Sequence, residues 1–178
     1  MKKQLLLLAA IALFIAVGCK KEDSAVVTPV ASDPIVATWV SEGLNVPFGL
    51  RSAPFKVKKI VATFNSNKSY TVVQTDSANV QTTFTGTIST TESTNTDTAS
   101  ASFTKGAKIN TIVANQATPS AVTSTGIFAI SGANMTYEII QTTPALAGVS
   151  APTAAGGFGS TTIAGTKYSI YVQKYVKQ

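Results

Sequence analysis

Residues 80–89 read VQTTFTGTIS, and this stretch decides the class of fold. Apolar or small side chains alternate with polar ones, so every second residue falls on the same face of an extended chain. One face carries Val80, Thr82, Phe84, Gly86 and Ile88, and the other carries glutamine, threonine and serine. A slip of one residue would turn the apolar row toward water, so the pairing register is well specified. The pattern predicts a strand with one face in a core.

Other segments follow the same rule, with turn residues between them. Clear alternation recurs over residues 99–104, 135–140 and 168–176, and less regular strands are predicted at 35–41, 57–64, 69–76, 109–115 and 124–130. Residues 65–68 and 131–134 have the composition of tight hairpin turns. We therefore predict an all-β fold, an antiparallel up-and-down barrel of about eight strands, whose closure removes the strand edges. A two-sheet β-sandwich is the alternative.

The composition fits an extracellular β protein and narrows the chemistry. Charged residues make up 12% of the chain, well below the usual quarter. The chain has no histidine, so the commonest general base and metal ligand is missing, and we expect no metal site and no cofactor. Without Lys2 and Lys3 the net charge of +6 becomes 12 minus 8, or +4. Its basic residues are too scattered to predict nucleic-acid binding.

The N-terminus has the pattern of a secretion signal. Lys2 and Lys3 precede an apolar run, residues 5–17, which suits a signal peptide and is short for a membrane span. Residues 16–19, Ala-Val-Gly-Cys, resemble the lipobox of bacterial lipoproteins. That resemblance implies a signal peptide over residues 1–18 and acyl chains on Cys19, which would anchor the protein firmly in a membrane. The alternatives are a plain signal peptide or an N-terminal membrane helix.

The residues after Cys19 suggest a location in the cell envelope. Residues 20–23, Lys-Lys-Glu-Asp, resemble the export signal of surface lipoproteins in some Gram-negative bacteria. The resemblance implies an outer-membrane lipoprotein exposed at the cell surface, with attachment facing the periplasm as the alternative. Residues 19–34 mix charge, serine, threonine and proline without periodicity, so we expect an acylated cysteine followed by a flexible tether. The barrel domain is then predicted to span residues 35–178.

Two long segments interrupt the strand pattern. Residues 42–54 and 144–166 are rich in glycine, proline and apolar residues. Loops of this length without secondary structure are usually functional or disordered. In one interpretation, both segments form the rim of a single barrel opening, and Phe48 and Phe158 are the residues that contact a ligand there. The other makes residues 144–166 a flexible hairpin connection.

Three stretches resemble the lipocalin-like domains of secreted bacterial lipoproteins. Residues 36–39, Val-Ala-Thr-Trp, resemble the Gly-x-Trp of the first lipocalin strand, with alanine in place of glycine. Residues 63–70 resemble the phenylalanine, polar turn and tyrosine of the first tight hairpin. Residues 126–136 resemble the later hairpin with Gly-x-aromatic-x-aliphatic-x-Gly. The three occur in the family's order in a chain of suitable length.

The resemblance implies a barrel closed at one end, with an apolar cavity and Trp39 packed near the base. A basic residue of the last lipocalin strand often covers that tryptophan, and Lys174 is the candidate here. The function it implies is non-catalytic binding of a small apolar or amphipathic ligand. The aromatic residues expected in the cavity or at its mouth are Phe48, Phe64, Tyr70, Phe84, Phe128, Tyr137 and Phe158.

Two other classes of function stay open. A surface module that binds polysaccharide or an envelope partner needs no cavity; it would use the Thr/Ser-rich face of residues 81–104, the basic stretch 51–59, or an exposed aromatic row such as Tyr171 and Tyr175. An enzyme is less favoured, because the serines have no histidine to activate them. Glu92 and Asp97 could pair as in glycosidases, but their segment is typical of a solvated turn. Glu138 is a lone carboxylate expected to be partly buried.

Overall fold

The computed structural model describes residues 33–100 and 102–178. The predicted signal peptide, the lipidation site at Cys19 and the tether up to residue 32 lie outside the described residues.

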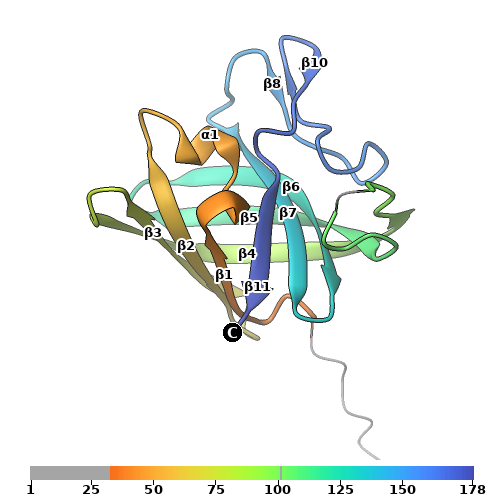
Figure 1. The fold of residues 1–178 in the computed structure, drawn as a ribbon, viewed down its shortest axis with the longest axis horizontal. Coiled ribbons are helices and arrows are strands. Elements are labelled where there is room, and N and C mark those ends of the chain that lie inside the picture. Colours follow the sequence, from red (N-terminus) through yellow and green to blue (C-terminus); the bar gives the residue numbers. More distant parts are fainter. Residues whose placement is uncertain (1–32, 101) are drawn as a thin grey trace, which may run out of the picture. The chain divides into compact units, whose positions relative to one another are not determined.

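Eight antiparallel strands close into a barrel (Figure 1). Each barrel strand pairs with the next barrel strand along the chain, so that β7 pairs with β11, and β11 closes the barrel against β1. The fold is thus the predicted up-and-down barrel, and the sandwich alternative is wrong. The barrel strands are β1 (Ala37–Glu42), β2 (Val57–Phe64), β3 (Ser69–Asp76), β4 (Gln81–Thr96), β5 (Lys108–Thr118), β6 (Val122–Ser131), β7 (Asn134–Thr143) and β11 (Gln173–Lys177).

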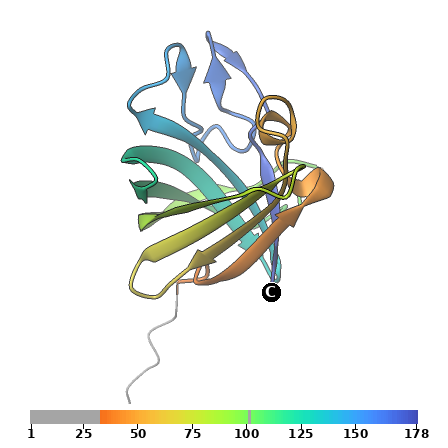
Figure 2. The same ribbon diagram turned by 90° about the vertical axis from the view of Figure 1, so that its left-hand side faces the viewer.

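The connections distinguish the two ends of the barrel. At one end, the base, lie the turns 65–68 and 132–133, the connection 97–107, and the end of β11. At the other, the loop end, are residues 43–56, 77–80, 119–121 and 144–172 (Figures 1 and 2). The loop end carries the short helices η1 (Gly43–Asn45) and α1 (Phe48–Arg51), and a small sheet of β8 (Val149–Ser150), β9 (Thr162–Ile163) and β10 (Thr166–Lys167).

Close approach between strands explains one glycine. A Cβ at Gly126 would lie 2.2 Å from the backbone oxygen of Glu138 on β7, closer than real Cβ atoms come to any neighbour. A residue with a side chain would push β6 and β7 apart, because the clash is with backbone and not with a movable side chain. Glycine therefore lets the two strands stay paired where the sheet curves.

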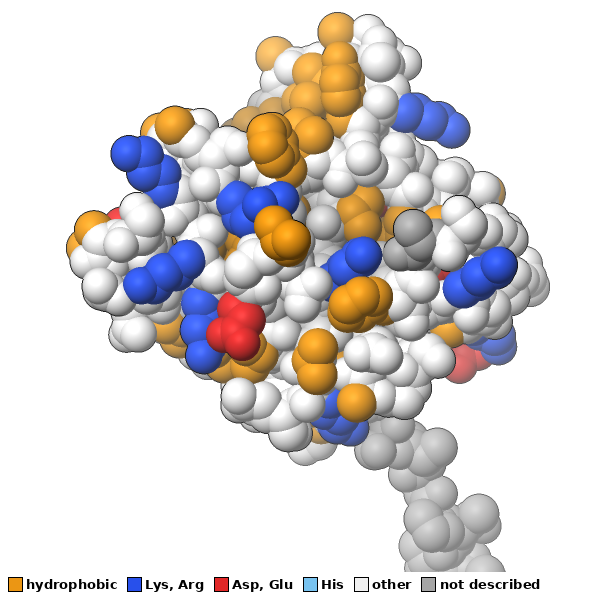
Figure 3. Space-filling view, in the orientation of Figure 1, with side chains coloured by type: hydrophobic (Ala, Val, Ile, Leu, Met, Phe, Trp, Pro, Cys, Tyr) orange, Lys and Arg blue, Asp and Glu red, His pale blue; other side chains and the backbone are white. Residues whose placement is uncertain are grey.

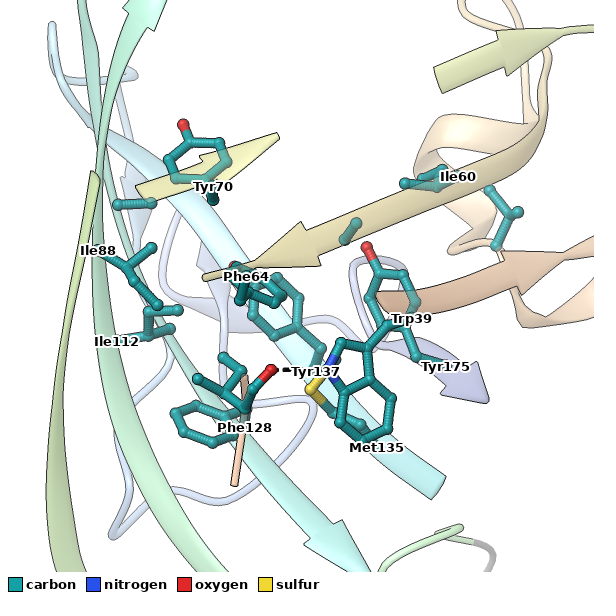
Figure 4. Close-up of a cluster of buried hydrophobic side chains, with 14 of the residues drawn as sticks. Trp39, Ile60, Phe64, Tyr70, Ile88, Ile112, Phe128, Met135, Tyr137 and Tyr175 are labelled. Atoms are coloured by element: carbon teal, nitrogen blue, oxygen red, sulfur yellow. Dashed lines mark hydrogen bonds between the residues drawn. The ribbon is translucent and has the colours of Figure 1, made fainter. Parts of the chain in front are cut away.

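The base is filled by apolar side chains. Trp39 is completely buried, and its indole N–H donates to the Ile35 carbonyl at 2.8 Å. Phe128 and Met135 are buried beside it, and Figure 4 shows the three side chains together. The same core continues through Ile88 and Ile112 on the opposite wall. Close packing of this kind stabilises the barrel through apolar burial.

One predicted strand is absent from the structure, and another is shorter than predicted. The described residues of the stretch 99–104 form no strand, although alanine and serine alternate there; β4 runs on to Thr96, and the chain then turns around Asp97. Asp97 is only 2% exposed, and its carboxylate accepts hydrogen bonds from the Ser102 and Thr104 hydroxyls. These bonds hold the connection in a turn, which alternation alone cannot predict. At the end of the chain, the strand begins at Gln173 and not at residue 168.

Candidate functional site

The barrel contains a partly open cavity of about 210 Å³. Its aromatic wall consists of Phe64, Tyr70, Phe84, Tyr137 and Tyr175. Its aliphatic lining consists of Leu50, Ile60, Val72, Ala114 and Ile139. Its polar lining consists of Gln74, Gln116, Ser124 and Gln173. The strand register explains the set, because on each strand these are alternate residues that share the inner face.

Helix α1 contributes to the cavity from the loop end. Leu50 lies among the lining residues, and the preceding Gly49 N–H donates to the carbonyl of Ile170 at 2.9 Å. Arg51 donates from Nε to the Val46 carbonyl at 2.8 Å and lies 5.9 Å from the ring of Phe48. The Gly49–Ile170 bond ties α1 to the segment before β11, and the Arg51 contacts hold the helix to the residues just before it and to its own Phe48. A short helix therefore closes part of the loop end.

Aromatic pairs form the deep wall. The rings of Phe64 and Tyr70 are 6.4 Å apart and tilted by 45°, and those of Tyr137 and Tyr175 are 6.0 Å apart in an edge-on arrangement of 80°. Such geometries match the charge distribution of the rings. The pairs join neighbouring strands along the cavity wall.

The pKa values of the three tyrosines of this wall are raised. Burial raises the pKa of Tyr137 well above its usual value, and the nearby Tyr175 and Tyr70 hydroxyls raise it further. Burial also raises the pKa of Tyr175, with the neighbouring Gln173 side chain offsetting part of the rise. The pKa of Tyr70 is raised by burial as well. Tyrosine is protonated at neutral pH even at its ordinary pKa, so all three carry O–H groups, and burial extends this state to higher pH.

Among the described residues, no lysine, arginine, aspartate or glutamate lines the cavity. Its polar groups are neutral amides and hydroxyls. Gln116 donates from Nε2 to the Ser120 carbonyl at 2.8 Å, so that amide nitrogen already has a partner. Gln173 is 5% exposed, and its side chain interacts with the Tyr175 hydroxyl.

The structure places the seven predicted aromatic residues in three different surroundings. Phe64, Tyr70, Phe84 and Tyr137 line the cavity. Phe128 is buried in the core of the base and is not among the lining residues. Phe48 is 60% exposed on α1 and also does not line the cavity.

The seventh aromatic residue, Phe158, packs outside the barrel. It lies against Ile109, Ile127 and Ala129, whose side chains leave the outer faces of β5 and β6. The interpretation in which Phe158 contacts a ligand at the rim of the barrel opening is therefore wrong. Part of this segment covers the outer wall, where apolar side chains need a cover to leave water.

Glu138 holds that cover in place. It points outward from β7, is completely buried, and accepts hydrogen bonds from the Gly159 N–H at 2.6 Å and the Thr161 N–H at 3.1 Å. The Thr161 hydroxyl donates a third bond at 2.5 Å. A carboxylate with three such donors is satisfied without a cation. Glu138 thus anchors the segment, on the side of the wall away from the cavity.

The cation near Trp39 is not the predicted one. Lys174 lies 4.7 Å from the ring of Phe103, whereas Lys177 lies 5.8 Å from the ring of Trp39. The register between β1 and β11 pairs Trp39 directly with Lys177, so their side chains share a face. The role expected of Lys174 at the barrel base therefore falls to Lys177.

The two carboxylates considered for catalysis have unrelated surroundings. Glu92 is exposed on β4 and forms an ion pair with Lys108 at 3.1 Å. Asp97 is buried among hydroxyl groups, so the prediction of a solvated turn is wrong. Within residues 33–100 and 102–178, no group of three potential metal-ligating side chains occurs, and no helix has the length and hydropathy to cross a membrane.

Sequence reasoning missed the aliphatic lining residues and Tyr175, and it missed all of the polar ones. Gln74 follows Tyr70 and Val72 on the inner face of β3, and Gln173 lies two positions before Tyr175 on β11. Period-two extension from the two tyrosines could have found both glutamines. The prediction of Tyr175 in an exposed aromatic row is wrong, because its side chain is 3% exposed and faces the interior.

No protein-family model matches the chain, and no curated protein or solved structure is significantly similar to it. A function for the chain therefore has to be argued from the barrel and its cavity.

Proposed function

We propose that the protein is a membrane-anchored lipoprotein whose lipocalin-like barrel binds a small apolar or amphipathic ligand without catalysing a reaction. The observation that carries the proposal is the cavity of about 210 Å³ with its aromatic wall and its few polar groups. Ligand sites in proteins typically combine apolar walls with a small number of placed polar groups. A barrel of eight strands is just wide enough for one small ligand.

The packing of the barrel base supports the lipocalin-like part of the proposal. A buried tryptophan on the first strand and a lysine of the last strand beside it correspond to what the resemblance implies, with Lys177 as the lysine. The anchoring part depends on the lipobox-like residues before Cys19. We propose acyl chains on Cys19 and a place in the outer membrane at the cell surface.

A second candidate is a surface module that binds polysaccharide or an envelope partner. The observation in its favour is the exposure of Leu44, Phe48 and Phe55 beside basic residues of the stretch 51–59. Figure 3 shows apolar and basic side chains side by side on this face of the molecule. The cavity favours internal binding, because a module that works only through its surface has no use for a hollow interior.

The test compares what the protein carries when it is purified from its source cells. Lipids extracted from the full chain are identified by mass spectrometry, for the native protein and for two variants of β5. Ala114→Trp fills the cavity, since Ala114 lines it, whereas Ala117→Trp changes an exposed residue of the same strand. We expect a molecule that the native protein and Ala117→Trp retain and that Ala114→Trp loses.

Circular dichroism establishes that both variants are folded, and Ala114→Leu replaces Ala114→Trp if the larger side chain prevents folding. Equal retention by all forms, or no retained molecule in any of them, would contradict internal binding and favour the surface module.

A further inference from the structure

The most exposed apolar side chains of the described residues all lie at the loop end. Leu44, Phe48, Phe55 and Val80 are 84%, 60%, 59% and 61% exposed, whereas no other large apolar side chain in the described part of the chain is more than 43% exposed. The first three belong to the connection 43–56, and Val80 belongs to the connection 77–80. One exposed apolar residue needs no explanation, but four at the same end of a molecule indicate an interaction site.

The two connections that carry these residues are bound to each other. The Ser77 N–H donates to the Lys56 carbonyl at 2.9 Å, and Lys58 Nζ donates to Asn79 Oδ1 at 2.6 Å. Strands β2 and β3 are also paired as far as the points where these connections begin. The exposed side chains and the neighbouring basic residues form a surface that we call the loop-end patch: Leu44, Phe48, Arg51, Phe55, Lys56, Lys58, Lys59 and Val80.

The basic residues of the loop-end patch have mainly neutral partners. Within residues 33–100 and 102–178, their one ion pair joins Lys59 to Glu42 at 3.6 Å. Arg51 donates to the Val46 carbonyl, and Lys58 donates to a neutral amide. Figure 3 shows basic and apolar side chains interspersed on this face of the molecule.

The patch therefore carries an excess of positive charge. The other carboxylate of this region, Asp76, is used within its own turn, where it accepts the N–H groups of Ala78 and Val80 at 2.8 Å. Four cations and two carboxylates leave a charge of 4 minus 2, or +2, over residues 42–59 and 76–80. Anionic headgroups attract cations, and the boundary with the acyl chains accepts apolar side chains. A surface that offers both is complementary to an anionic lipid bilayer.

The type of the apolar side chains favours lipid over a sugar polymer. Leu44 and Val80 are aliphatic, so they gain free energy by leaving water for an acyl region. They have neither a flat ring nor a polar group with which to bind a sugar. All four apolar side chains come from turns or short helices, and none from the flat face of a strand. This placement suits residues that enter a bilayer surface one by one.

The loop-end patch and the cavity share one helix. Phe48 is the first residue of α1 and is exposed, whereas Leu50, two residues later, lines the cavity. The Gly49 N–H holds α1 to the Ile170 carbonyl at 2.9 Å. Contact of the patch with a bilayer would therefore bring the part of the cavity that Leu50 lines close to lipid.

The length of chain before the barrel is compatible with this contact. Asp33 forms an ion pair with Lys68 in the turn 65–68, at the base. Asp33 follows Cys19 by 33 minus 19, or 14, residues, which reach up to about 50 Å when extended. A strand of about ten residues is only about 34 Å long. An anchor at Cys19 thus leaves either end of the barrel able to meet the bilayer.

We propose that the loop-end patch docks on an anionic phospholipid surface, with its four apolar side chains at the boundary of the acyl chains and its cations against the lipid phosphates. The inference goes beyond the proposed function, because it concerns a contact of the folded barrel with the bilayer in addition to acyl chains on Cys19. It needs no ligand in the cavity.

The experiment places a tryptophan reporter at each end of the barrel. Phe48→Trp reports on the loop-end patch, and Val176→Trp, at a 42% exposed position near the end of β11, is the matched reporter at the base. The full chain is reconstituted in vesicles of equal parts phosphatidylglycerol and phosphatidylcholine with brominated acyl chains, which quench indoles that enter the bilayer. Trp39 is buried and contributes the same background to each form, and the native protein measures that background.

Docking and anchoring give different results with these reporters. Acyl chains on Cys19 would bring both reporters near the vesicle, whereas docking puts only position 48 into lipid. We expect quenching of Phe48→Trp to be at least about threefold stronger than that of Val176→Trp. Equal quenching of the two reporters, or none at position 48, would overturn the inference. Phe103→Trp, at another exposed position near the base, replaces Val176→Trp if that variant does not fold.

Charge variants of the Phe48→Trp form test the choice of an anionic surface. Lys56→Gln combined with Lys58→Gln should lower the quenching at least about twofold, because each cation near the surface contributes to binding. Lys105→Gln combined with Lys108→Gln removes the same charge from exposed positions elsewhere and should leave the quenching unchanged. Equal effects of the two pairs, or equal quenching in vesicles of brominated phosphatidylcholine alone, would contradict an anionic lipid surface as the partner.

A sugar partner would give another result. If vesicles leave position 48 unquenched while surface polysaccharide from the source cells changes the emission of Phe48→Trp, the inference fails. The patch would then belong to the second candidate function.

Discussion

The two halves of the barrel are built on the same strands but filled differently. At the base, Trp39, Phe128 and Met135 are buried together in the core. Above this filled part, alternate residues of these strands and their neighbours surround a cavity that extends from Phe64 and Tyr70, beside the turn 65–68, to Leu50 at the loop end. Gln74 and Ser124 are half-buried on its wall. Strand β7 passes through both halves, contributing Met135 to the first and Ile139 to the second. Side-chain choice, and not backbone geometry, therefore separates the part that stabilises the fold from the part that is free to bind.

The largest difference is expected from truncating one side chain in each half. Trp39→Ala should lower the free energy of unfolding by about 3–5 kcal/mol, because it removes a large buried ring and leaves a void. Val72→Ala, on the cavity wall, should cost about 1 kcal/mol, since its side chain already adjoins empty space. Urea denaturation measures both. Similar losses would contradict the division, and Trp39→Phe provides a milder test if Trp39→Ala does not fold.

The next largest effect on stability is expected on the outer wall of the barrel, where one carboxylate is covered by a loop and another is exposed to solvent. Glu138→Gln should lower the free energy of unfolding by about 1–3 kcal/mol, because an amide cannot accept all three bonds from Gly159 and Thr161. Hydrogen exchange at those two backbone amides should also become faster. Glu92→Gln, which changes only an exposed ion pair, is the control and should shift stability by less than about 0.5 kcal/mol. Equal effects of the two changes would show that Glu138 does not anchor the segment.

Alkaline pH should destabilise the protein through the buried tyrosines of the cavity wall. The pKa values of Tyr137 and Tyr175 are raised in the folded protein, so these groups keep protons that the unfolded chain loses above pH 10. Stability is then fully present below pH 10 and falls above it, by about 1.4 kcal/mol per pH unit for each group. Thermal melting between neutral and alkaline pH measures the fall, and Tyr175→Phe should make it shallower. An unchanged alkaline profile in Tyr175→Phe would contradict the burial of that hydroxyl.

Acidic pH should destabilise the protein to a smaller extent, through Asp33 at the base of the barrel. Burial raises the pKa of Asp33, but hydrogen bonds from Lys68, Thr90 and the Ile35 N–H outweigh it, so the net pKa is lowered. The stabilisation is therefore present above the unfolded value of 3.8 and is lost as pH falls through the folded pKa. Because the site is partly exposed, we expect less than about 1 kcal/mol. Asp33→Asn should flatten the acid limb of a stability profile, and an unaltered limb would contradict this origin.

Local pattern was enough to predict the barrel and part of its cavity. The predicted strands 57–64 and 69–76 have the observed bounds of β2 and β3, because alternation and a polar turn are both local signals. Four predicted aromatic residues line the cavity for the same reason. The failures come from contacts distant in the chain. The covering of Ile127 by Phe158 and the pairing of Trp39 with Lys177 depend on how loops fold back and how the barrel closes.

The polar character of the cavity was harder to predict. A glutamine at an alternate position is typical of a solvated face, so the residue type alone gave no sign that Gln74 and Gln173 lie inside. The register of the closed barrel is what brings them to the inner face.

The most direct test of the contrast between the halves is a methyl NMR titration of the full chain with a lipid extract of its source cells. If the cavity binds a ligand and the base is filled, resonances of Val72, Ala114 and Ile139 on the cavity wall shift, while those of Met135 at the base and Ile127 on the outer wall stay in place. Shifts confined to outward-facing residues such as Leu44, or no shifts at all, would contradict a ligand site inside the barrel.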